Sequence, residues 1–236
     1  ELGGAAPEKA LDYACALEML HCYSLIHDDM PCMDNDDFRR GRPSCHKQFG
    51  ESTALLAADA LVTAAFEVIA HADLPAESRV EAAALLAKAG GARGMLYGQE
   101  LDKHYEITRA SEEQLLELHR NKTGALIIAA VELGCTAANA APALRAALVQ
   151  YAAEVGLVFQ IVDDILDVTS TTEELGKPVG SDADNDKTTF ITLYGLDGTR
   201  ALAKSHNDAA LAALDGFGTQ EDFLRLLAAE LLQRKK

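Results

Sequence analysis

Apolar residues recur along this chain at helical spacing, and Ala and Leu far outnumber the β-branched residues that favour strands. Six segments share this richness in Ala and Leu and are predicted to be helices: 8–27, 51–72, 76–99, 111–133, 143–168 and 220–234. Ser111 with Gln114 three residues later is typical of a capped helix start. Gly and Pro residues separate the predicted elements. The pattern predicts an all-α protein.

Several predicted helices are apolar on more than one face, as in the run Leu-Ile-Ile-Ala-Ala-Val at 126–131. Such helices are typical of the interior of a many-helix assembly or of a subunit contact. The 236 residues, 49% of them hydrophobic, are enough for one domain with a large core. We therefore expect a large single-domain helical bundle around a central cavity, spanning residues 1–236.

Charge and composition exclude some classes of function. The net charge of −16 argues against nucleic-acid binding, which relies on clustered Lys and Arg. No run of about 18 uncharged apolar residues is present, so no membrane-spanning segment is expected. The five cysteines include no CxxC pair, and reduced thiols in a cytoplasmic compartment are the simplest interpretation. The chain begins without Met or a signal region, and we expect that the start of the natural protein is missing.

Two segments concentrate carboxylates among apolar neighbours: Asp28-Asp29-Met-Pro-Cys-Met-Asp34 and Asp163-Asp164-Ile-Leu-Asp167. Clustered carboxylates repel one another unless a cation compensates their charge. Oxygen-only donor sets suit Mg²⁺, which takes about six oxygens at roughly 2.1 Å and usually keeps some places for water or phosphate. The two segments predict a site that holds diphosphate through metal ions.

The expected helices place these carboxylates. Asp163 and Asp167 are four residues apart and share a helical face, with Gln160 one turn earlier. Asp28 shares a stripe with His21 and Ser24.

Beyond Asp28, Pro31 disfavours further helix. The chain should then loop so that Asp34 folds back toward Asp28, and one ion could be held by both. A simpler interpretation is also open, in which the acidic residues are solvated and Arg39 and Arg40 merely pair with nearby acidic residues.

The acidic segments belong to longer motifs that occur in a fixed order. The run 27–43, His-Asp-Asp-Met-Pro-Cys-Met-Asp-Asn-Asp-Asp-Phe-Arg-Arg-Gly-Arg-Pro, resembles the first aspartate-rich motif of trans-isoprenyl diphosphate synthases, and 159–167 resembles the second. Gly-Gln-Glu-Leu-Asp at 98–102, Asn-Lys-Thr-Gly at 121–124, Leu-Gly-Lys at 175–177 and Asp-Lys-Thr-Thr at 186–189 also fit this family. The resemblance covers essentially the whole chain and implies the isoprenoid synthase fold.

The resemblance implies a head-to-tail prenyl transfer between isoprenyl diphosphates, most like that of bacterial farnesyl diphosphate synthases. Three Mg²⁺ ions would bridge an allylic diphosphate to both acidic segments. The carboxylates implied as ligands, or as residues that complete or orient the metal shells, are Asp28, Asp29, Asp34, Asp163, Asp164 and Asp167. The ions would neutralise the charge that develops on the departing diphosphate.

The same resemblance assigns the cationic residues. Arg39, Lys122 and Lys177 would bind the allylic diphosphate, and His21 and Arg40 would contact isopentenyl diphosphate. Arginine suits this role because its guanidinium can donate two parallel hydrogen bonds to phosphate oxygens.

Further roles are implied around the hydrocarbon. Thr123 and Gln160 would steady the carbocation, so that with Lys122 and Lys177 they form the implied catalytic set, and Lys187 would lie near the mouth of the cavity. The proton is expected to leave to the departing diphosphate, so no side-chain base is required. Without the resemblance, the lysines would be read as solvated.

Two features bear on the product and on activity. In the family, the residues four and five places before the first aspartate, Ser24 and Tyr23 here, help to form the floor of the product cavity. With two additional residues inside the first motif, Tyr23 favours farnesyl diphosphate, with geranylgeranyl diphosphate as the alternative. A Gly-Lys-x-x-Arg-Pro segment expected before the first motif has no match here, so the chain either lacks its natural start or is a degenerate relative.

Two other classes of function fit the sequence less well. A terpene cyclase would carry one such acidic motif and an aromatic cavity, but aromatic residues make up only 6% of this chain and Trp is absent. A non-catalytic partner subunit would have lost metal ligands, and this chain retains both sets. The wide apolar faces are compatible with the homodimers that are common in this family.

Overall fold

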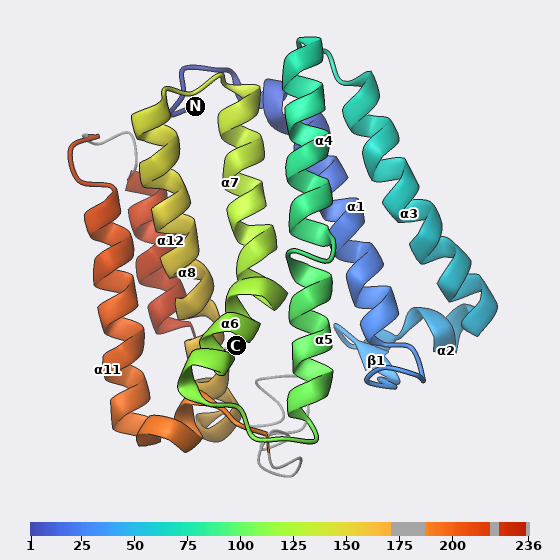
Figure 1. Cartoon of the computed structure of the whole chain (residues 1–236), viewed down its shortest axis with the longest axis vertical. Coiled ribbons are helices and arrows are strands. Elements are labelled where there is room, and N and C mark those ends of the chain that lie inside the picture. The colour runs from blue at the N-terminus through green and yellow to red at the C-terminus, as the bar shows by residue number, and fades with distance from the viewer. Residues whose placement is uncertain (171–186, 218–221, 235–236) are drawn as a thin grey trace. The chain divides into compact units, whose positions relative to one another are not determined.

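The computed structural model describes residues 1–170, 187–217 and 222–234, and these residues are overwhelmingly helical (Figure 1). The all-α prediction is therefore confirmed. The helices in chain order are η1 (Pro7–Ala10), α1 (Leu11–Asp28), α2 (Cys45–Phe49), α3 (Glu51–His71), α4 (Ala76–Gly90), α5 (Met95–Tyr105), α6 (Glu112–His119), η2 (Arg120–Gly124), α7 (Ala125–Ala137), α8 (Pro142–Thr169), α11 (Phe190–Ala213) and α12 (Asp222–Gln233). Within the described ranges, the only strands are β1 (Phe38–Arg39) and β2 (Arg42–Pro43), which pair antiparallel.

Most predicted helices lie close to their expected bounds, as α3 and α8 do. The predicted capping box is also present, because the Ser111 hydroxyl accepts from the Gln114 N–H and the Gln114 side chain accepts from the Ser111 N–H. The segment 76–99 was wrongly predicted as one helix, since α4 ends at Gly90 and α5 begins at Met95. Gly94 precedes α5, and a Cβ atom there would lie 2.2 Å from the Ala89 carbonyl oxygen, so the turn needs glycine.

The sequence did not predict a π turn or the helix α11. The segment 111–133 contains a turn of π-helix, η2, between α6 and α7. Helix α11 was missed entirely. Its interior holds Gly195 at φ 66°, a left-handed conformation that interrupts the helix and weakens the local helical pattern.

The chain forms two compact units. The first consists mainly of Gly3–Ala87 with Leu133–Asn139, and the second of Lys88–Glu132 with Ala140–Lys236. In the first unit, α1 packs along α3, and α2 packs against the start of α3. The buried Tyr13 hydroxyl donates to Ser78 Oγ at 3.2 Å.

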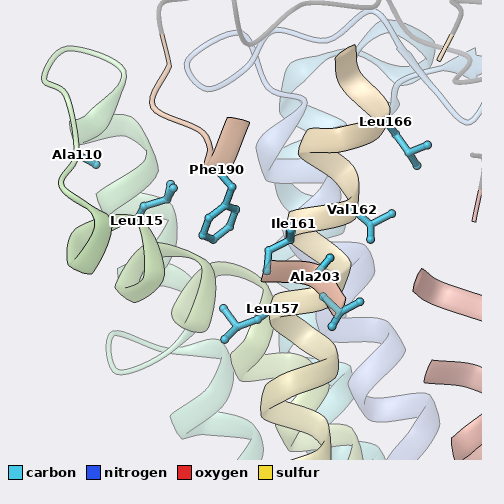
Figure 2. Close-up of a cluster of buried hydrophobic side chains, with 9 residues drawn as sticks. Ala110, Leu115, Leu157, Ile161, Val162, Leu166, Phe190 and Ala203 are labelled. Carbon is cyan, nitrogen blue, oxygen red and sulfur yellow. The ribbon is translucent and has the colours of Figure 1, made fainter. Parts of the chain in front are cut away.

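Helix α8 is the central element of the second unit and packs against α6, η2, α11 and α12. A cluster of buried residues lies along its apolar face and includes residues of α8 itself: Ala110, Leu115, Leu157, Val158, Ile161, Val162, Leu166, Phe190 and Ala203. Figure 2 shows these side chains gathering from several segments, with the Phe190 ring among them. The helix that carries the second acidic segment is therefore anchored by its apolar face, which fixes the direction of its carboxylates.

Two helices, α3 and α8, are long and apolar enough to cross a membrane by length and composition alone. Half of the most apolar stretch of α8 is buried among other parts of the structure, as in the core helix of a globular protein, and 22% of that of α3 is buried. Such helices are weak evidence for a membrane span. The five cysteines, all within the described ranges, form no disulfide.

Candidate active site

The first acidic segment folds as the sequence predicts. Helix α1 ends at Asp28, and three residues after Pro31 the Asp34 N–H donates to the Asp28 carbonyl oxygen at 2.9 Å. The loop is closed further by the Asn35 N–H, which donates to the Met30 carbonyl oxygen at 3.1 Å. This loop brings Asp28 and Asp34 back to the same end of α1, as expected for two carboxylates that serve one site.

Asp29 is directed at an arginine. The residue is 2% exposed, and its carboxylate accepts from Arg39 Nε at 2.8 and 2.9 Å and from Nη2 at 2.5 Å. The hydrogen bond with Asp29 is the largest influence on the guanidinium and raises the pKa of Arg39, with burial acting in the opposite direction. Asp36 lies farther from Arg39, at 3.9 Å. Asp29 is therefore placed to orient Arg39.

The two adjacent arginines stand on a short hairpin. Phe38 pairs with Pro43 and Arg39 with Arg42, and the intervening Arg40 and Gly41 both have positive φ, 52° and 74°. A two-residue hairpin turn with positive φ at both positions matches the natural twist of the strands. The hairpin gives the two arginines different environments, since Arg39 turns inward to Asp29 while Arg40 remains exposed.

The residues predicted to meet isopentenyl diphosphate and the product lie on α1. His21 is half-buried, and burial, the largest cause, lowers the pKa of His21, assisted by Arg40 and Arg39 and opposed by Glu18. Arg40 is therefore near enough to act on this imidazole. Tyr23 is also half-buried, with its ring edge-on to that of His27 at 4.7 Å.

The second acidic segment lies on α8 with its carboxylates in different environments. Asp164 and Asp167 are 8% and 3% exposed, whereas the Asp163 side chain is 43% exposed. Asp164 Oδ2 accepts from the Phe190 backbone N–H at 2.7 Å and so fixes the first turn of α11. Gln160 Nε2 donates to Asp163 Oδ2 at 3.2 Å, as its position one turn earlier predicts.

Arg234 also reaches this segment, a contact that the sequence did not predict. Its Nη2 donates to Asp163 Oδ1 and, at 2.9 Å, to the Phe159 carbonyl oxygen, while the guanidinium carbon lies 4.0 Å from the centre of the Phe159 ring. No local pattern signals this contact, because the two partners are far apart in the chain. The arginine supplies a positive charge to the carboxylate most exposed in this segment.

Lys122 and Thr123 lie in the π turn η2, where Lys122 Nζ contacts Asp102 Oδ2 at 2.5 Å. Burial alone would raise the pKa of Asp102, but Lys122 and Lys187 together with the Lys122 hydrogen bond lower it overall. Asp102 is thus held ionised beside the lysine. Lys187 Nζ lies 3.2 Å from Glu106 Oε1, and the predicted Lys177 lies outside the described residues.

The carboxylates suit Mg²⁺ that shares its shell with substrate. No group of three His, Cys, Asp or Glu side chains within the described ranges is close enough to hold an ion alone. Asp28 and Asp34 lie on one loop of the first unit, and Asp163 lies on α8 in the second unit. Mg²⁺ is commonly bound by one or two carboxylates together with substrate phosphates and water, so the carboxylates of each unit, taken separately, fit that mode of binding.

Comparison with known proteins accounts for nearly the whole chain. A family model described as polyprenyl synthetase matches residues 2–216. The farnesyl diphosphate synthase of Haemophilus influenzae is 44% identical over 234 residues, covering 98% of this chain and 79% of that protein. A chloroplastic geranylgeranyl pyrophosphate synthase of Catharanthus roseus is 44% identical over 224 residues, covering 94% of this chain and 63% of that protein.

A solved structure agrees with the sequence comparisons. The Helicobacter pylori geranyltransferase, complexed with magnesium and isoprenyl diphosphate, matches with a TM-score of 0.82 and 38% identity, covering 94% of this chain and 73% of that one. The all-α architecture is therefore that of the isoprenyl synthases.

Proposed function

Because the chain belongs to the polyprenyl synthetase family, we propose that it is a prenyltransferase which condenses isopentenyl diphosphate head-to-tail with an allylic diphosphate and releases diphosphate. The observation that carries this proposal is the environment of Asp163. Its exposed carboxylate is bonded by Gln160 and Arg234, and in the same unit Lys122 is paired with Asp102. The unit thus combines carboxylates for metal ions, a lysine that can bind diphosphate and an amide that can stabilise a carbocation, and the reaction needs all three.

The first step is the ionisation of the bound allylic diphosphate. Arg39, Lys122 and Lys177 bind the allylic diphosphate, whose carbon–oxygen bond breaks so that the electron pair leaves with the diphosphate. Bound Mg²⁺ would neutralise charge on that leaving group, held by Asp28, Asp34 and Asp163. The electrostatic stabilisation is provided by groups that are in place before the bond breaks.

Condensation follows at the allylic cation. The double bond of isopentenyl diphosphate, bound by His21 and Arg40, supplies the electrons of the new carbon–carbon bond, and the resulting cation loses a proton to the departed diphosphate. Gln160 and Thr123 direct the negative ends of their dipoles toward the transient positive charge. No side chain is required as a base.

The proposed product is farnesyl diphosphate, formed from dimethylallyl and then geranyl diphosphate. The half-buried Tyr23 on α1 supports this length, as does the similarity to a farnesyl diphosphate synthase. Geranylgeranyl diphosphate is the second candidate, because a synthase of that product is equally similar in identity. Three Mg²⁺ ions, a homodimer and a cytoplasmic location complete the proposal.

The test is an assay with radiolabelled isopentenyl diphosphate, Mg²⁺ and either dimethylallyl or geranyl diphosphate, followed by chromatography of the dephosphorylated alcohols. Farnesol as the main product would support the proposal, and geranylgeraniol would select the second candidate. Cyclic hydrocarbons formed from an allylic diphosphate alone would contradict prenyl transfer and identify a terpene cyclase.

A further inference from the structure

Asp163 and Asp164 are adjacent on α8 but lie in different surroundings. The Asp163 side chain is partly exposed, whereas Asp164 is buried. Asp164 Oδ2 accepts from the backbone N–H of Phe190 at 2.7 Å, and the Phe190 ring lies within the buried cluster (Figure 2). A buried carboxylate needs hydrogen bonds or positive charge to compensate its burial. The backbone of Phe190 supplies part of this compensation to Asp164.

The hydrogen bond falls at the N-terminus of α11. Phe190 is the first residue of this helix, after the N-cap residue Thr189, and the N–H groups of a first helical turn have no carbonyl partner within the helix. A negative charge near this end is also stabilised by the helix dipole. Asp164 thus satisfies a backbone donor of α11 and gains stabilisation of its own charge, so the contact ties α8 to the first turn of α11.

The residues directly before α11 are held as well. Thr188 Oγ1 accepts from the Ala110 N–H at 3.1 Å, and Thr189 forms the capping box that closes the first turn. Together with the bond from Phe190 to Asp164, these contacts fix the backbone at three successive residues. Lys187 is the next residue toward the N-terminus, so its side chain extends from a stretch of chain whose path is fixed.

Lys187 reaches the end of α5, close to the proposed site of the diphosphate. Its Nζ lies 3.2 Å from Glu106 Oε1. Glu106 follows Asp102 by one helical turn, and the Glu106 N–H donates to the Asp102 carbonyl oxygen at 3.1 Å. Residues four apart lie on the same face of a helix, and Lys122 Nζ contacts Asp102 Oδ2 at 2.5 Å. The ammonium groups of Lys122 and Lys187 are therefore bound to neighbouring carboxylates on one face of α5.

We propose that Asp164 is a positioning residue, which holds the first turn of α11 and thereby sets the place of Lys187 next to the pair of Asp102 and Lys122. The proposal deepens the proposed function and rests on it for its catalytic consequence, since Lys187 adds a second ammonium to the group that binds the allylic diphosphate. Burial of the Phe190 ring anchors the side chain, and the bond to Asp164 fixes the backbone from which the preceding residues extend. Contact with the metal ion is left to the exposed carboxylate next to Asp164 on α8.

The first experiment compares Asp164→Ala with Asp164→Asn. Alanine removes the acceptor, whereas asparagine keeps an oxygen for the Phe190 N–H and loses the charge. Asp164→Ala should raise KM for the allylic diphosphate by about 10- to 100-fold, because a hydrogen bond to a charged group contributes this much to binding, and should change KM for isopentenyl diphosphate much less. Asp164→Asn should return KM most of the way to the wild-type value. An asparagine variant as impaired as the alanine variant would overturn the proposal.

Asp163→Asn is the matched control on the neighbouring carboxylate. It removes the charge of the proposed metal ligand, so the concentration of Mg²⁺ that gives half of the maximal rate should rise steeply. In Asp164→Asn this concentration should stay close to that of the wild type. An equal rise in the two variants would make Asp164 a metal ligand and overturn the proposal. This comparison does not depend on the folding of the alanine variant.

A double-mutant cycle with Lys187→Gln identifies the route of the effect. If Asp164 acts through Lys187, Asp164→Ala should raise KM little further once this lysine has been replaced. Lys103→Gln is the control, because Lys103 Nζ also contacts Glu106 Oε1, at 3.0 Å, but extends from α5 and not from the segment before α11. In that background the full effect of Asp164→Ala should remain. Additive losses with Lys187→Gln would overturn the proposal.

A measurement without substrate separates this proposal from the proposed function. In ¹⁵N-labelled protein, the Phe190 amide proton should exchange slowly with solvent in the wild type and in Asp164→Asn, and at least about tenfold faster in Asp164→Ala. Equal exchange in all three proteins would overturn the positioning role whatever the activity of the enzyme. A slowly exchanging Phe190 amide in a wild type that makes no prenyl product would support the positioning of α11 and would count against the proposed function.

Discussion

The backbone of Gly98 rests directly against the backbone of Lys122. A Cβ atom on Gly98 would lie 2.0 Å from the Lys122 nitrogen and 2.5 Å from its Cα, closer than any real side chain could approach. Asp102, one turn further along α5, meets the Lys122 ammonium at 2.5 Å. The absence of a side chain on one helix therefore sets the distance at which the Asp102–Lys122 pair forms.

Gly98→Ala should destabilise the protein and displace Lys122. Overpacking of this kind costs about 1 to 3 kcal/mol, and the clash is with backbone that cannot rotate away. Gly134→Ala is the matched control, since it lies within α7 with no atom within 4 Å of its Cβ position, and it should be neutral or slightly stabilising. Urea denaturation measures both, and equal stability of the two variants would contradict the close contact.

Asp28→Ala and Asp163→Ala should each abolish turnover, with a loss of about a thousandfold, because electrostatic stabilisation of the leaving group is commonly the largest catalytic contribution. The helical circular dichroism signal should remain nearly unchanged. Asp197→Ala removes the same charge from a fully exposed position on α11 and should retain activity. Full turnover in either of the first two variants would refute the proposed metal roles.

Arg39→Met should lower the free energy of unfolding by about 3 kcal/mol, because it leaves the carboxylate of Asp29 buried without its guanidinium. The added substitution Asp29→Asn should recover much of this loss by removing the buried charge. Arg42→Met, at an exposed position on the opposite strand, is the control and should have little effect. A double variant no more stable than Arg39→Met would show that the ion pair is not the cause.

Tyr23→Ala should lengthen the main product by one five-carbon unit, because it removes bulk from the proposed floor of the cavity. Chromatography of the dephosphorylated alcohols measures the shift. Tyr194→Ala, a partly exposed tyrosine on α11, should leave the distribution of products as it is. An unaltered distribution in Tyr23→Ala would exclude Tyr23 from the floor.

The stability of the protein should depend on pH through His119. Burial lowers the pKa of His119 in the folded protein to about 4, against an ordinary value of 6.5, with Lys122 acting in the same direction and Asp102 and Gln160 in the opposite one. As the pH falls from 6.5 to 4, the unfolded chain binds a proton that the folded chain excludes, so folding loses stability, whereas above pH 6.5 this group has no effect. The loss should reach about 3 kcal/mol at pH 4.

His119→Phe should remove this contribution. As the pH is lowered, the unfolding free energy of the wild type should therefore fall more steeply than that of the variant. Urea denaturation at several pH values measures the difference. Parallel pH profiles for the two proteins would show that His119 does not titrate differently in the folded state.

The features that the sequence predicts well are those decided within a few residues. The capping box of Ser111 and Gln114, the end of α1 before Pro31 and the return of Asp34 to Asp28 all follow from local geometry, and the structure confirms them. The resemblance of the two acidic segments identified the family for the same reason, since each motif is contiguous.

The features that the sequence missed depend on distant partners. Helix α11 begins with a capping box at Thr189, but its start is also fixed by the Asp164 carboxylate and by burial of Phe190, neither of which has a local signature. Propensity alone is a weak guide where two glycines and several β-branched residues fall within one helix. Arg234 was missed in the same way, because only the folded chain brings it to Asp163.

The π turn at Arg120–Gly124 absorbs one residue more than regular helical winding would. An α-helix rotates about 100° per residue, so one extra residue in a regular helix would turn every later side chain about the axis by that angle. The wider turn takes up this rotation before α7 begins, and Ala129 keeps its buried place at 1% exposed. The extra residue therefore changes the directions of side chains inside the turn, such as Lys122, and leaves the core contacts of α7 as they are.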